Sequence, residues 1–269
     1  MKLAECRVLL TGAAGGIGQA AATALLQAGA AVLLTGRSPA RLATQARALE
    51  RRFSLTPERV DWRAADLATA DGPGTLARQA GDWGCNVVIH NAGLPSFGRF
   101  DDLAPADLRR LLDTNLLAPM LLTQALLPHL SRLPRAQVVC VGSALGRIGL
   151  PGYAAYSASK FGLRGFAEAL RRELAGGPVR VQYFGPRSTR TDFNDARAQA
   201  FTDATGSAMD TPETVAAALV RFIEDEAAER FVGFPEKLAV RLNGLAPTWL
   251  DRSLSAQGRH LPPATPSLT

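Results

Sequence analysis

The sequence opens with a short apolar run that ends directly in a glycine-rich turn. The run RVLLT occupies residues 7–11, and the turn GAAGGIG follows at residues 12–18. Residues 17–28 are rich in Ala and Leu and show a helical pattern that stops at Gly29. The start of a helix carries N–H groups without intrahelical partners and the positive end of the helix dipole, so such a unit can hold an anion. This opening predicts an α/β fold with a phosphate-binding turn.

Apolar runs and helical patterns then alternate along the chain. The runs are short and apolar at consecutive positions, which is typical of strands buried on both faces of a parallel sheet. The expected strands are residues 7–11, 31–35, 60–64, 86–90, 137–141, 179–184 and 230–234. The expected helices are residues 17–28, 39–53, 75–83, 105–130, 153–174 and 211–224. The alternation predicts a Rossmann-like, doubly wound parallel sheet of about seven strands with helices on both faces.

Several helix boundaries have recognisable chemistry. Ser38 is expected to cap the helix that begins at Pro39, and Thr211 is expected to cap the helix around residues 211–224. Proline lacks the N–H that a helix interior needs, so the long helix at residues 105–130 is expected to bend near Pro119.

The chain has 269 residues, enough for one large domain. No internal repeat or linker interrupts the alternation, so residues 1–256 are expected to form a single Rossmann-type domain with a C-terminal extension from about residue 235. Residues 257–269 are rich in Pro, Ser and Thr, and we expect them to form a disordered tail.

The net charge of +6 raises the question of a nucleic-acid partner. Basic residues are scattered and interleaved with acids, and no run of five occurs. This distribution favours a solvated surface rich in arginine and argues against nucleic-acid binding.

Cysteine, histidine and hydropathy exclude other classes. The three cysteines are far apart, and the chain has three histidines, which argues against a disulfide framework and a metal site. No apolar run reaches the roughly 18 residues of a membrane span, and the first residues do not resemble a secretory signal. We therefore expect a cytoplasmic protein.

Tyr156 and Lys160 are four residues apart in the helix expected at residues 153–174, so they share one helix face. A phenol ordinarily titrates near pH 10. A nearby ammonium favours the phenolate and lowers the pKa of the phenol, which suits proton transfer at neutral pH. The chain has three tyrosines, so this spacing rarely arises by chance; a surface contact is the alternative.

Polar residues follow two strands of the expected sheet. Ser143 comes just after residues 137–141, and the sequence Asn-Ala-Gly at residues 91–93 follows residues 86–90. Open α/β sheets bind ligands beyond the carboxyl ends of their strands, where a serine hydroxyl can meet a substrate oxygen. Asn115 falls inside a long helix among apolar neighbours, although asparagine is a poor helix former. Packing alone is the alternative explanation for Asn115.

Together these motifs resemble the classical short-chain dehydrogenase/reductase (SDR) family. The motifs T-G-x-x-x-G-x-G, N-A-G, the helical Asn, the strand-end Ser and Y-x-x-x-K occur in the family's order and spacing. Each is weak or moderate alone, whereas the ordered set is highly specific, and the resemblance covers residues 5 to about 235. It implies an oxidoreductase that moves hydride between a nicotinamide cofactor and a carbonyl or secondary alcohol.

The resemblance also implies a role for each matching residue. Tyr156 would be the general acid in reduction and the base in oxidation, Lys160 would lower its pKa and bind the nicotinamide ribose, and Ser143 would orient and polarise the carbonyl. Asn115 would hold the water of a proton relay that reaches Lys160. Besides Tyr156 and Lys160, the residues expected to bind the cofactor are Gly12, Gly15, Gly16, Ile17, Gly18, Arg37, Ser38, Asp66, Leu67, Asn91, Ala92, Gly93, Pro186, Thr189 and Thr191.

The end of the second strand bears on the choice of cofactor. Members that prefer NAD often carry an acidic residue there, but this chain has Gly36 followed by Arg37 and Ser38. A guanidinium suits a 2′-phosphate through paired, charge-assisted hydrogen bonds. The sequence therefore favours NADP(H), with NAD(H) as the alternative and a merely solvated Arg37 as the simplest explanation. The second basic residue of some NADP-type members is absent, since Gly15 occupies its place.

Two regions depart from the family pattern. Arg187 replaces the glycine that usually follows Pro186; Arg187 and Arg190 are expected to face water, with contact to a phosphate or an acidic substrate as the alternative. The polar residues 189–210 are expected to form a mobile lid. After residue 235 the chain lacks the C-terminal strand typical of acyl-carrier-protein ketoreductases of the family.

Residues 238–250 are apolar and dotted with arginine. They suit an amphipathic helix at a membrane surface or near a lipid substrate, but equally one packed on the domain or on a second subunit. The first of these is the less expected.

The leading hypothesis is an NADP(H)-dependent oxidoreductase acting on a hydrophobic small molecule, because few charged residues fall near the expected site. A catalytically silent nucleotide sensor and a membrane-associated lipid or acyl ketoreductase are the alternatives. By resemblance, the helices at residues 105–130 and 153–174 imply a homodimer or homotetramer.

Overall fold

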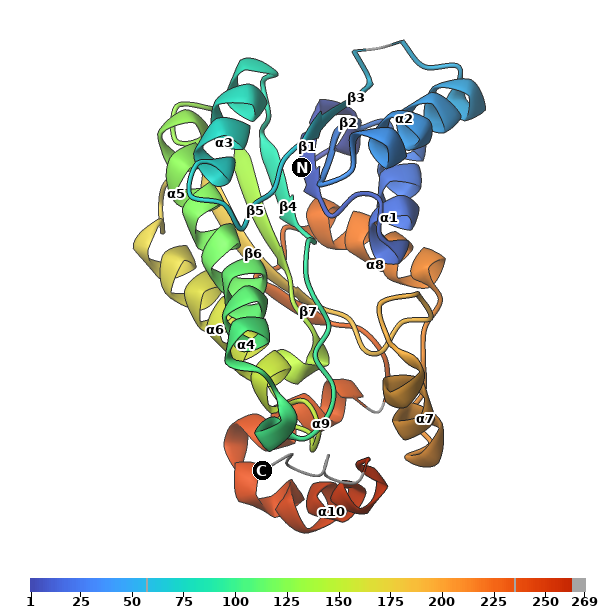
Figure 1. Cartoon of the computed structure of the whole chain (residues 1–269). Coiled ribbons are helices and arrows are strands. Elements are labelled where there is room, and N and C mark those ends of the chain that lie inside the picture. The colour runs from blue at the N-terminus through green and yellow to red at the C-terminus, as the bar shows by residue number, and fades with distance from the viewer. Residues whose placement is uncertain (57, 235, 263–269) are drawn as a thin grey trace.

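The computed structural model describes residues 1–56, 58–234 and 236–262. Within them, the centre of the molecule is a parallel sheet of seven strands (Figure 1). The strands are β1 (Arg7–Thr11), β2 (Ala31–Gly36), β3 (Val60–Ala64), β4 (Val87–His90), β5 (Ala136–Val141), β6 (Val179–Gly185) and β7 (Glu229–Phe231). Their order is β3-β2-β1-β4-β5-β6-β7. The chain thus reverses its direction of winding between β1 and β4, which is where open α/β sheets hold their ligands.

Helices cover both faces of the sheet (Figure 1). They are α1 (Gly16–Gln27), α2 (Pro39–Phe53), α3 (Gly72–Asp82), α4 (Pro105–Leu112), α5 (Ala118–Leu130), α6 (Ala154–Glu173), α7 (Ala196–Ala204), α8 (Pro212–Asp225), α9 (Glu236–Leu245) and α10 (Asp251–Ser255). The side chains of α1, α2 and α8 enter one apolar core, and those of α3, α5 and α6 enter another. The doubly wound fold predicted from the sequence is confirmed.

The two cores explain why the strands read as continuous apolar runs. Successive side chains of a strand point to opposite faces. Leu9 enters the core under α3, α5 and α6, whereas its neighbour Leu10 enters the core under α1, α2 and α8. Both are fully buried, so apolar residues are needed on both faces in the middle of β1.

Most boundaries follow the expected chemistry. The Ser38 hydroxyl accepts the N–H of Arg41 at 3.4 Å, and the Thr211 hydroxyl accepts the N–H of Thr214 at 3.2 Å, so both caps are confirmed. α3 begins at Gly72 rather than at residue 75, and β7 ends at Phe231 rather than at residue 234.

The long helix expected at residues 105–130 is interrupted between α4 and α5. Asp113–Leu117 form a π-helical turn, in which the N–H of Ala118 bonds to the carbonyl of Asp113, five residues back. Pro119 has no N–H and cannot close the α-helical hydrogen bond to the carbonyl of Asn115. The irregularity thus lies just before Pro119 and places Asn115 at its centre.

The C-terminal region differs most from expectation. α7 lies within residues 189–210, where a mobile lid without a defined helix was expected, and α9 and α10 follow β7. The expected disordered tail at residues 257–269 begins in a short 3-10 helix, Ala256–His260, whereas its residues 263–269 lie outside the described residues. No helix in the described part of the chain is long and apolar enough to cross a membrane.

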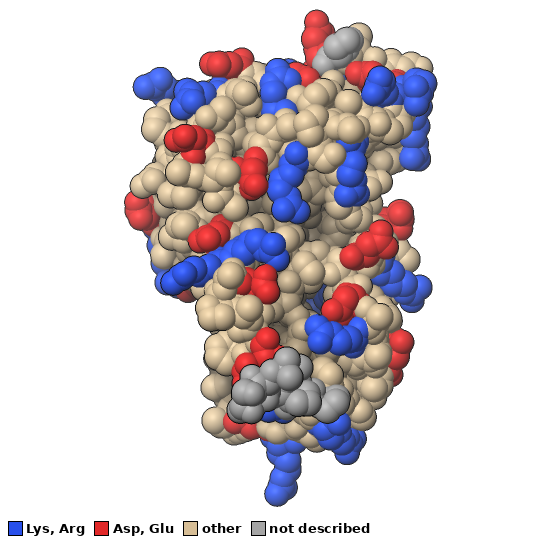
Figure 2. All heavy atoms as spheres, viewed as in Figure 1, with Lys and Arg blue, Asp and Glu red and all other residues tan. Residues whose placement is uncertain are grey.

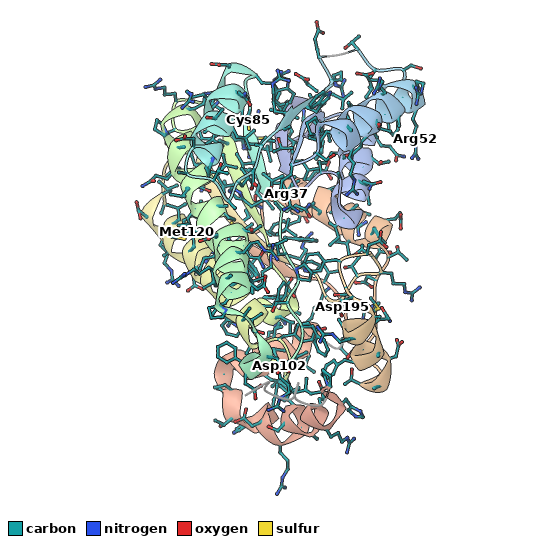
Figure 3. The ribbon with its side chains drawn as sticks, in the orientation of Figure 1. Arg37, Arg52, Cys85, Asp102, Met120 and Asp195 are labelled. Atoms are coloured by element: carbon teal, nitrogen blue, oxygen red, sulfur yellow. The ribbon has the colours of Figure 1, made fainter. Side chains whose placement is uncertain are left out.

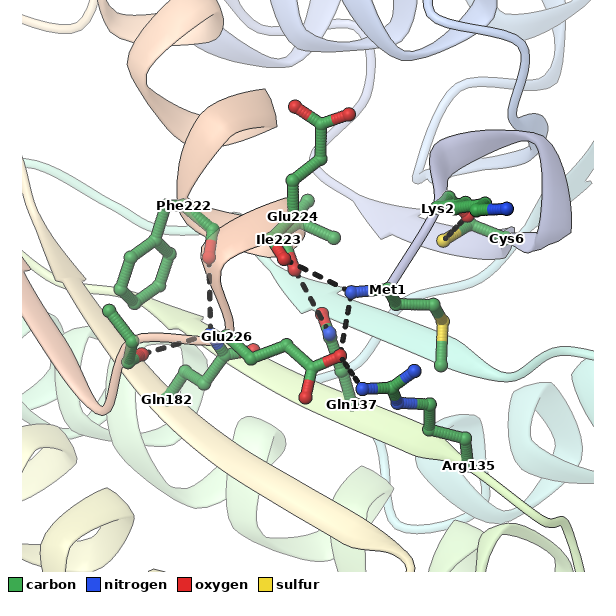
Figure 4. A network of polar contacts seen from close by, with 11 residues as sticks. Met1, Lys2, Cys6, Arg135, Gln137, Gln182, Phe222, Ile223, Glu224 and Glu226 are labelled. Atoms are coloured by element: carbon green, nitrogen blue, oxygen red, sulfur yellow. Dashed lines mark hydrogen bonds and ion pairs between the residues drawn. The ribbon is translucent and has the colours of Figure 1, made fainter.

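A polar network at the amino ends of the strands closes the fold on the side opposite the site (Figure 4). The Met1 nitrogen lies 2.6 Å from the carboxylate of Glu226, which also pairs with Arg135 at 2.8 Å. From β5, the amide of Gln137 donates to the carbonyl of Ile223 at 3.0 Å. These contacts satisfy the end of α8, where backbone carbonyls lack helical partners.

Candidate active site

The carboxyl ends of β1 and β4 are joined by a compact set of hydrogen bonds. The Thr11 hydroxyl accepts the N–H groups of Asn91 and Ala92, each at 3.0 Å, and donates to the carbonyl of Ile89 at 3.2 Å. The Asn91 amide donates to the carbonyls of Thr11 and Gly12 at 3.0 and 3.1 Å. Asn91 therefore holds the first strand end against the fourth, which fixes the glycine-rich turn in place.

The glycine-rich turn packs too closely for side chains. Gly12 has a φ of +63°, and a Cβ there would collide with the backbone of Ala92. A Cβ at Gly18 would collide with the backbone of the turn itself, and one at Gly16 with the side chain of Thr191. Gly15 occupies the N-cap position of α1, and no side chain caps the helix. The first N–H groups of α1, including that of Ile17, thus face no capping side chain.

Two side chains of α2 donate hydrogen bonds to backbone carbonyls of this turn. A guanidinium nitrogen of Arg41 donates to the carbonyl of Ala14 at 2.8 Å, and the amide of Gln45 donates to the carbonyl of Ala13 at 3.0 Å. Arg37 follows β2 directly; it is exposed and, among the described residues, has no ion-pair partner (Figure 3). Ser38 uses its oxygen to cap α2, which leaves its hydroxyl proton available as a donor.

Asp66 and Leu67 lie just after β3, the edge strand next to β2. The Asp66 carboxylate accepts the N–H of Ala68 at 3.0 Å and shapes a tight turn. Leu67 packs against the core under α3. Asp66 is exposed, so its second carboxylate oxygen faces solvent.

Ser143 and Tyr156 meet above the end of β5. The side chain of Ser143 lies close enough to the Tyr156 hydroxyl to affect its pKa. The Ser143 oxygen accepts the N–H of Leu145 at 3.1 Å, which orients the serine. Burial raises the pKa of Tyr156 well above its ordinary value of 10, whereas the nearby Ser143 side chain lowers it and nearby Tyr153 raises it. Tyr156 is therefore a neutral phenol at pH 7.

Lys160 lies on the same helix face and is 4% exposed. Its Nζ donates to the carbonyl of Val141 at 3.2 Å and lies 5.7 Å from the centre of the Tyr156 ring. Burial lowers the pKa of Lys160 to about 8. Burial is the largest cause of the raised pKa of Tyr156, and the Lys160 ammonium is turned toward the carbonyl of Val141.

Asn115 is fully buried, and its side chain links the backbone of Leu94 to Ser159. Its side-chain oxygen accepts the N–H of Leu94 at 2.7 Å, and its amide donates to the carbonyl of Leu94 at 3.0 Å and to the Ser159 hydroxyl at 3.3 Å. A Cβ at Gly93 would lie 3.4 Å from Asn115 Oδ1 and 3.8 Å from Lys160 Nζ. Asn115, Gly93 and Lys160 are thus brought together, with the side chain of Asn115 already engaged by the protein.

The loop after β6 joins these parts. The Pro186 carbonyl accepts the N–H of Ala144 at 2.9 Å, next to Ser143. The Thr189 hydroxyl donates to the carbonyl of Arg187 at 3.1 Å, and Thr191 covers Gly16. Arg187 pairs with Asp210 at 2.7 Å and is largely buried, so the expectation that it faces water was wrong. The ion pair ties both ends of the segment that carries α7.

Comparison with known proteins identifies the family that the sequence motifs resemble. The sequence pattern of the family described as "short chain dehydrogenase" matches residues 7–201. The chain belongs to the short-chain dehydrogenase family. It is 31% identical over 265 residues to dehydrogenase/reductase SDR family member 7B of Xenopus laevis, covering 94% of this chain and 81% of that protein. It is also 31% identical over 255 residues to the ketoacyl reductase HetN of a Nostoc strain, covering 91% and 86%.

Solved structures of short-chain dehydrogenases share the fold. One from Streptomyces avermitilis is 25% identical, with a TM-score of 0.78 over 94% of this chain and 98% of that one. One from Sphingobium yanoikuyae, solved in complex with NADPH, is 22% identical with a TM-score of 0.78 over 98% of both chains. Membership of the short-chain dehydrogenase family makes this chain an oxidoreductase by descent, as the motifs implied.

The structure adds a residue to this short-chain dehydrogenase that the sequence analysis did not single out. The Tyr183 hydroxyl accepts the N–H of Ser143 at 3.1 Å and donates to the carbonyl of Ser143 at 2.9 Å. Its buried ring fills the space that a side chain at Gly142 or Gly146 would need. A buried phenol must find a hydrogen-bond partner, and this requirement was the available signal for Tyr183.

Aromatic side chains cluster beside the ring of Tyr156. The Phe193 ring lies 6.1 Å from the Tyr156 ring, centre to centre, and Tyr153 lies 6.3 Å from it. Phe97 packs on Tyr153 at 4.9 Å and on Phe201 of α7 at 5.1 Å. These residues come from four separate segments and form an apolar wall beside the phenol.

Proposed function

We propose that this short-chain dehydrogenase transfers hydride between NADP(H) and the carbonyl or secondary alcohol of an apolar small molecule. The observation that carries the proposal is the placement of Ser143 beside the Tyr156 phenol, with buried Lys160 on the same helix face and Asn115 close to Lys160. A proton donor, a second hydroxyl and a buried cation then converge beyond the carboxyl ends of β4 and β5.

The residues present fit a nicotinamide dinucleotide. The uncapped start of α1 offers N–H groups to a pyrophosphate, and buried Lys160 has one hydrogen bond in the structure for an ammonium with three donors. Gly12, Gly15, Gly16, Ile17, Gly18, Asn91, Ala92 and Gly93 would line the path between these two points. The bound nicotinamide would supply the hydride. Pro186, Thr189 and Thr191 would close over the turn.

The protein's own residues handle the proton. In reduction, the neutral phenol of Tyr156 would donate its proton to the carbonyl oxygen, while the hydroxyl of Ser143 donates a second hydrogen bond to that oxygen. Lys160 would stabilise the phenolate that remains and hold the nicotinamide ribose. The side chain of Asn115 is bound to Leu94 and Ser159. The backbone carbonyl of Asn115 would therefore be the group that holds a water, and this water would return a proton toward Lys160.

The preference for NADP(H) rests on Arg37. The guanidinium is exposed at the end of β2, and the proton of the Ser38 hydroxyl is free to join it on a 2′-phosphate. The Sphingobium relative of the same fold was solved with NADPH. Asp66 and Leu67 would lie near the adenine. NAD(H) is the alternative, since the turn itself carries no basic residue.

The apolar wall favours an apolar substrate. Tyr153 and Phe193 lie beside the proton donor, and Phe97 and Phe201 pack on Tyr153. Arg187 is engaged by Asp210 rather than offered to an acidic ligand. Nicotinamide fluorescence with NADPH and NADH, followed by turnover of aromatic and aliphatic ketones, tests the proposal. A silent nucleotide sensor would bind the cofactor and turn over nothing.

Self-association through α5 and α6 is part of the proposal. Met120, Leu121 and Phe161 expose apolar side chains on these two helices, and Leu117 exposes one at the end of the π-helical turn before α5. Apolar patches on helices are common oligomer contacts. Light scattering that gives a dimer or tetramer, reduced to a monomer by Leu121→Glu, would support this arrangement.

A further inference from the structure

The C-terminal extension, defined as residues 236–260, turns an apolar face toward solvent. Leu238, Leu242 and Leu245 follow the spacing of one helix face on α9 and are 51%, 38% and 85% exposed. Trp249, in the short 3-10 helix Pro247–Leu250 that follows α9, is 78% exposed. A helix at the surface of a globular protein normally points its apolar residues the other way.

The opposite face of α9 is anchored, so this orientation is fixed by packing. Val240 is 2% exposed and packs against Ala144 and Ile148, in a small core of its own. The Asn243 amide donates to the carbonyl of Arg147 at 2.7 Å. Rotating α9 to bury its leucines would break both contacts. The apolar face is therefore a stable feature of the surface.

Basic side chains lie at the end of the molecule that α9 and α10 form (Figure 2). Residues 236–260 contain four basic residues, Lys237, Arg241, Arg252 and Arg259, and two acids, Glu236 and Asp251. Lys237 and Arg241 each precede an exposed leucine and are exposed themselves. In the described part of the chain neither has an ion-pair partner. The charge beside the apolar face is thus available to an anionic surface.

We propose that this face binds the surface of an anionic lipid bilayer, with α9 lying in the plane of the headgroups. Leucines and a tryptophan that enter the acyl boundary, next to lysine and arginine at headgroup level, are the two elements that such binding needs. A second copy of the chain fits less well. Isologous pairing of this face would bring Lys237 and Arg241 toward their own copies, and like charges repel.

The position of α9 would set the active site beside the bilayer. Val240 packs on Ala144, the residue after Ser143, and α9 and α10 form the end of the molecule next to α7 (Figure 1). A membrane-dissolved substrate would thus have a short route to the apolar wall. This last point rests on the proposed function, whereas lipid binding does not.

Flotation with vesicles tests the role of charge. Wild-type protein should float with vesicles of phosphatidylcholine and phosphatidylglycerol, and less with phosphatidylcholine alone or at high salt. Lys237→Glu/Arg241→Glu should weaken binding by more than about tenfold. The matched control is Arg51→Glu/Arg52→Glu, which makes the same charge change at the far end of α2 (Figure 3). Equal loss in both variants would mean that net charge alone drives binding and would overturn the proposal.

A second pair of variants tests the apolar face. Leu238→Ser/Leu242→Ser should abolish most vesicle binding, whereas Leu238→Met/Leu242→Met, which keeps both exposed positions of α9 apolar, should not. Unchanged thermal unfolding would show that the variants are folded. The proposal fails if wild-type protein ignores both kinds of vesicle. It also fails if the face instead forms a concentration-dependent dimer that the Leu238→Ser/Leu242→Ser variant cannot form.

Discussion

The hydroxyl of Tyr183 makes two hydrogen bonds to the backbone of Ser143: it accepts the N–H at 3.1 Å and donates to the carbonyl at 2.9 Å. The Ser143 side chain in turn lies beside the Tyr156 hydroxyl and lowers its pKa. One buried tyrosine on β6 thus positions the serine that would orient the substrate. Such support of a reacting group by its neighbours decides how well the group is aligned.

Removing this support should slow the reaction without unfolding the protein. Tyr183→Phe keeps the ring between Gly142 and Gly146 but deletes both bonds to Ser143. Leaving those buried groups unpaired costs about 1–3 kcal/mol of stability. Because Ser143 then loses its alignment, kcat should fall about tenfold or more. Cofactor affinity, measured by fluorescence, should not change. An unaltered kcat with a lowered melting temperature would show that Tyr183 only stabilises the fold.

The buried ammonium of Lys160 should lower the free energy of unfolding at neutral pH. Burial lowers its pKa from 10.5 to about 8, so between these values the unfolded chain binds a proton that the folded chain does not. Stability attributable to this group therefore rises with pH across that window and is lowest below pH 8. Lys160→Met should increase the free energy of unfolding at pH 7, by a few kcal/mol at most, while it abolishes turnover.

Urea titrations of wild type and Lys160→Met at pH 7 and pH 10 measure this effect. The difference between them should shrink at pH 10. A variant less stable than wild type at both pH values would contradict the account.

His90 should contribute to acid unfolding. It is buried on β4, its Nε2 lies 2.8 Å from the Thr123 hydroxyl, and burial lowers its pKa to about 4. Between pH 4 and the ordinary value of 6.5 the unfolded state takes up a proton that the folded state refuses, so stability falls as pH falls through this range. His90→Gln, which keeps a partner for Thr123, should flatten the pH dependence of the melting temperature between pH 6.5 and 4. An unchanged slope would exclude His90.

Arg37 should determine cofactor preference. Charge-assisted hydrogen bonds to a phosphate contribute about 1.5–3 kcal/mol, so Arg37→Ala should weaken NADPH binding about tenfold to a hundredfold and leave NADH binding nearly unchanged. Arg52→Ala, which removes an exposed arginine at the other end of α2, is the control (Figure 3). Equal losses for both cofactors would refute Arg37 as the phosphate-binding residue.

The sequence was most informative where structure depends on near neighbours. The strands, the glycine-rich turn and the caps at Ser38 and Thr211 follow from local periodicity and from single side chains, and the structure confirms them. The approach of Thr191 to Gly16 and the pairing of Arg187 with Asp210 join segments far apart in the chain. No local pattern contains that information.

The pKa of Tyr156 shows the same limit. The four-residue spacing correctly placed Lys160 on its helix face, yet the direction of the shift depends on how deeply the phenol is buried and on where the ammonium points. Both are set by packing against β5. The four-residue spacing therefore does not determine how Lys160 affects the pKa of Tyr156.

The central claim is that Tyr156 is the proton donor of a nicotinamide-dependent reduction. The most direct test compares wild type with Tyr156→Phe for NADPH binding by fluorescence and for turnover of a ketone that the wild type reduces. The account predicts equal NADPH affinity and a kcat lower by about a hundredfold or more, since general acid catalysis contributes 10²–10⁴. Turnover that survives the substitution would contradict it.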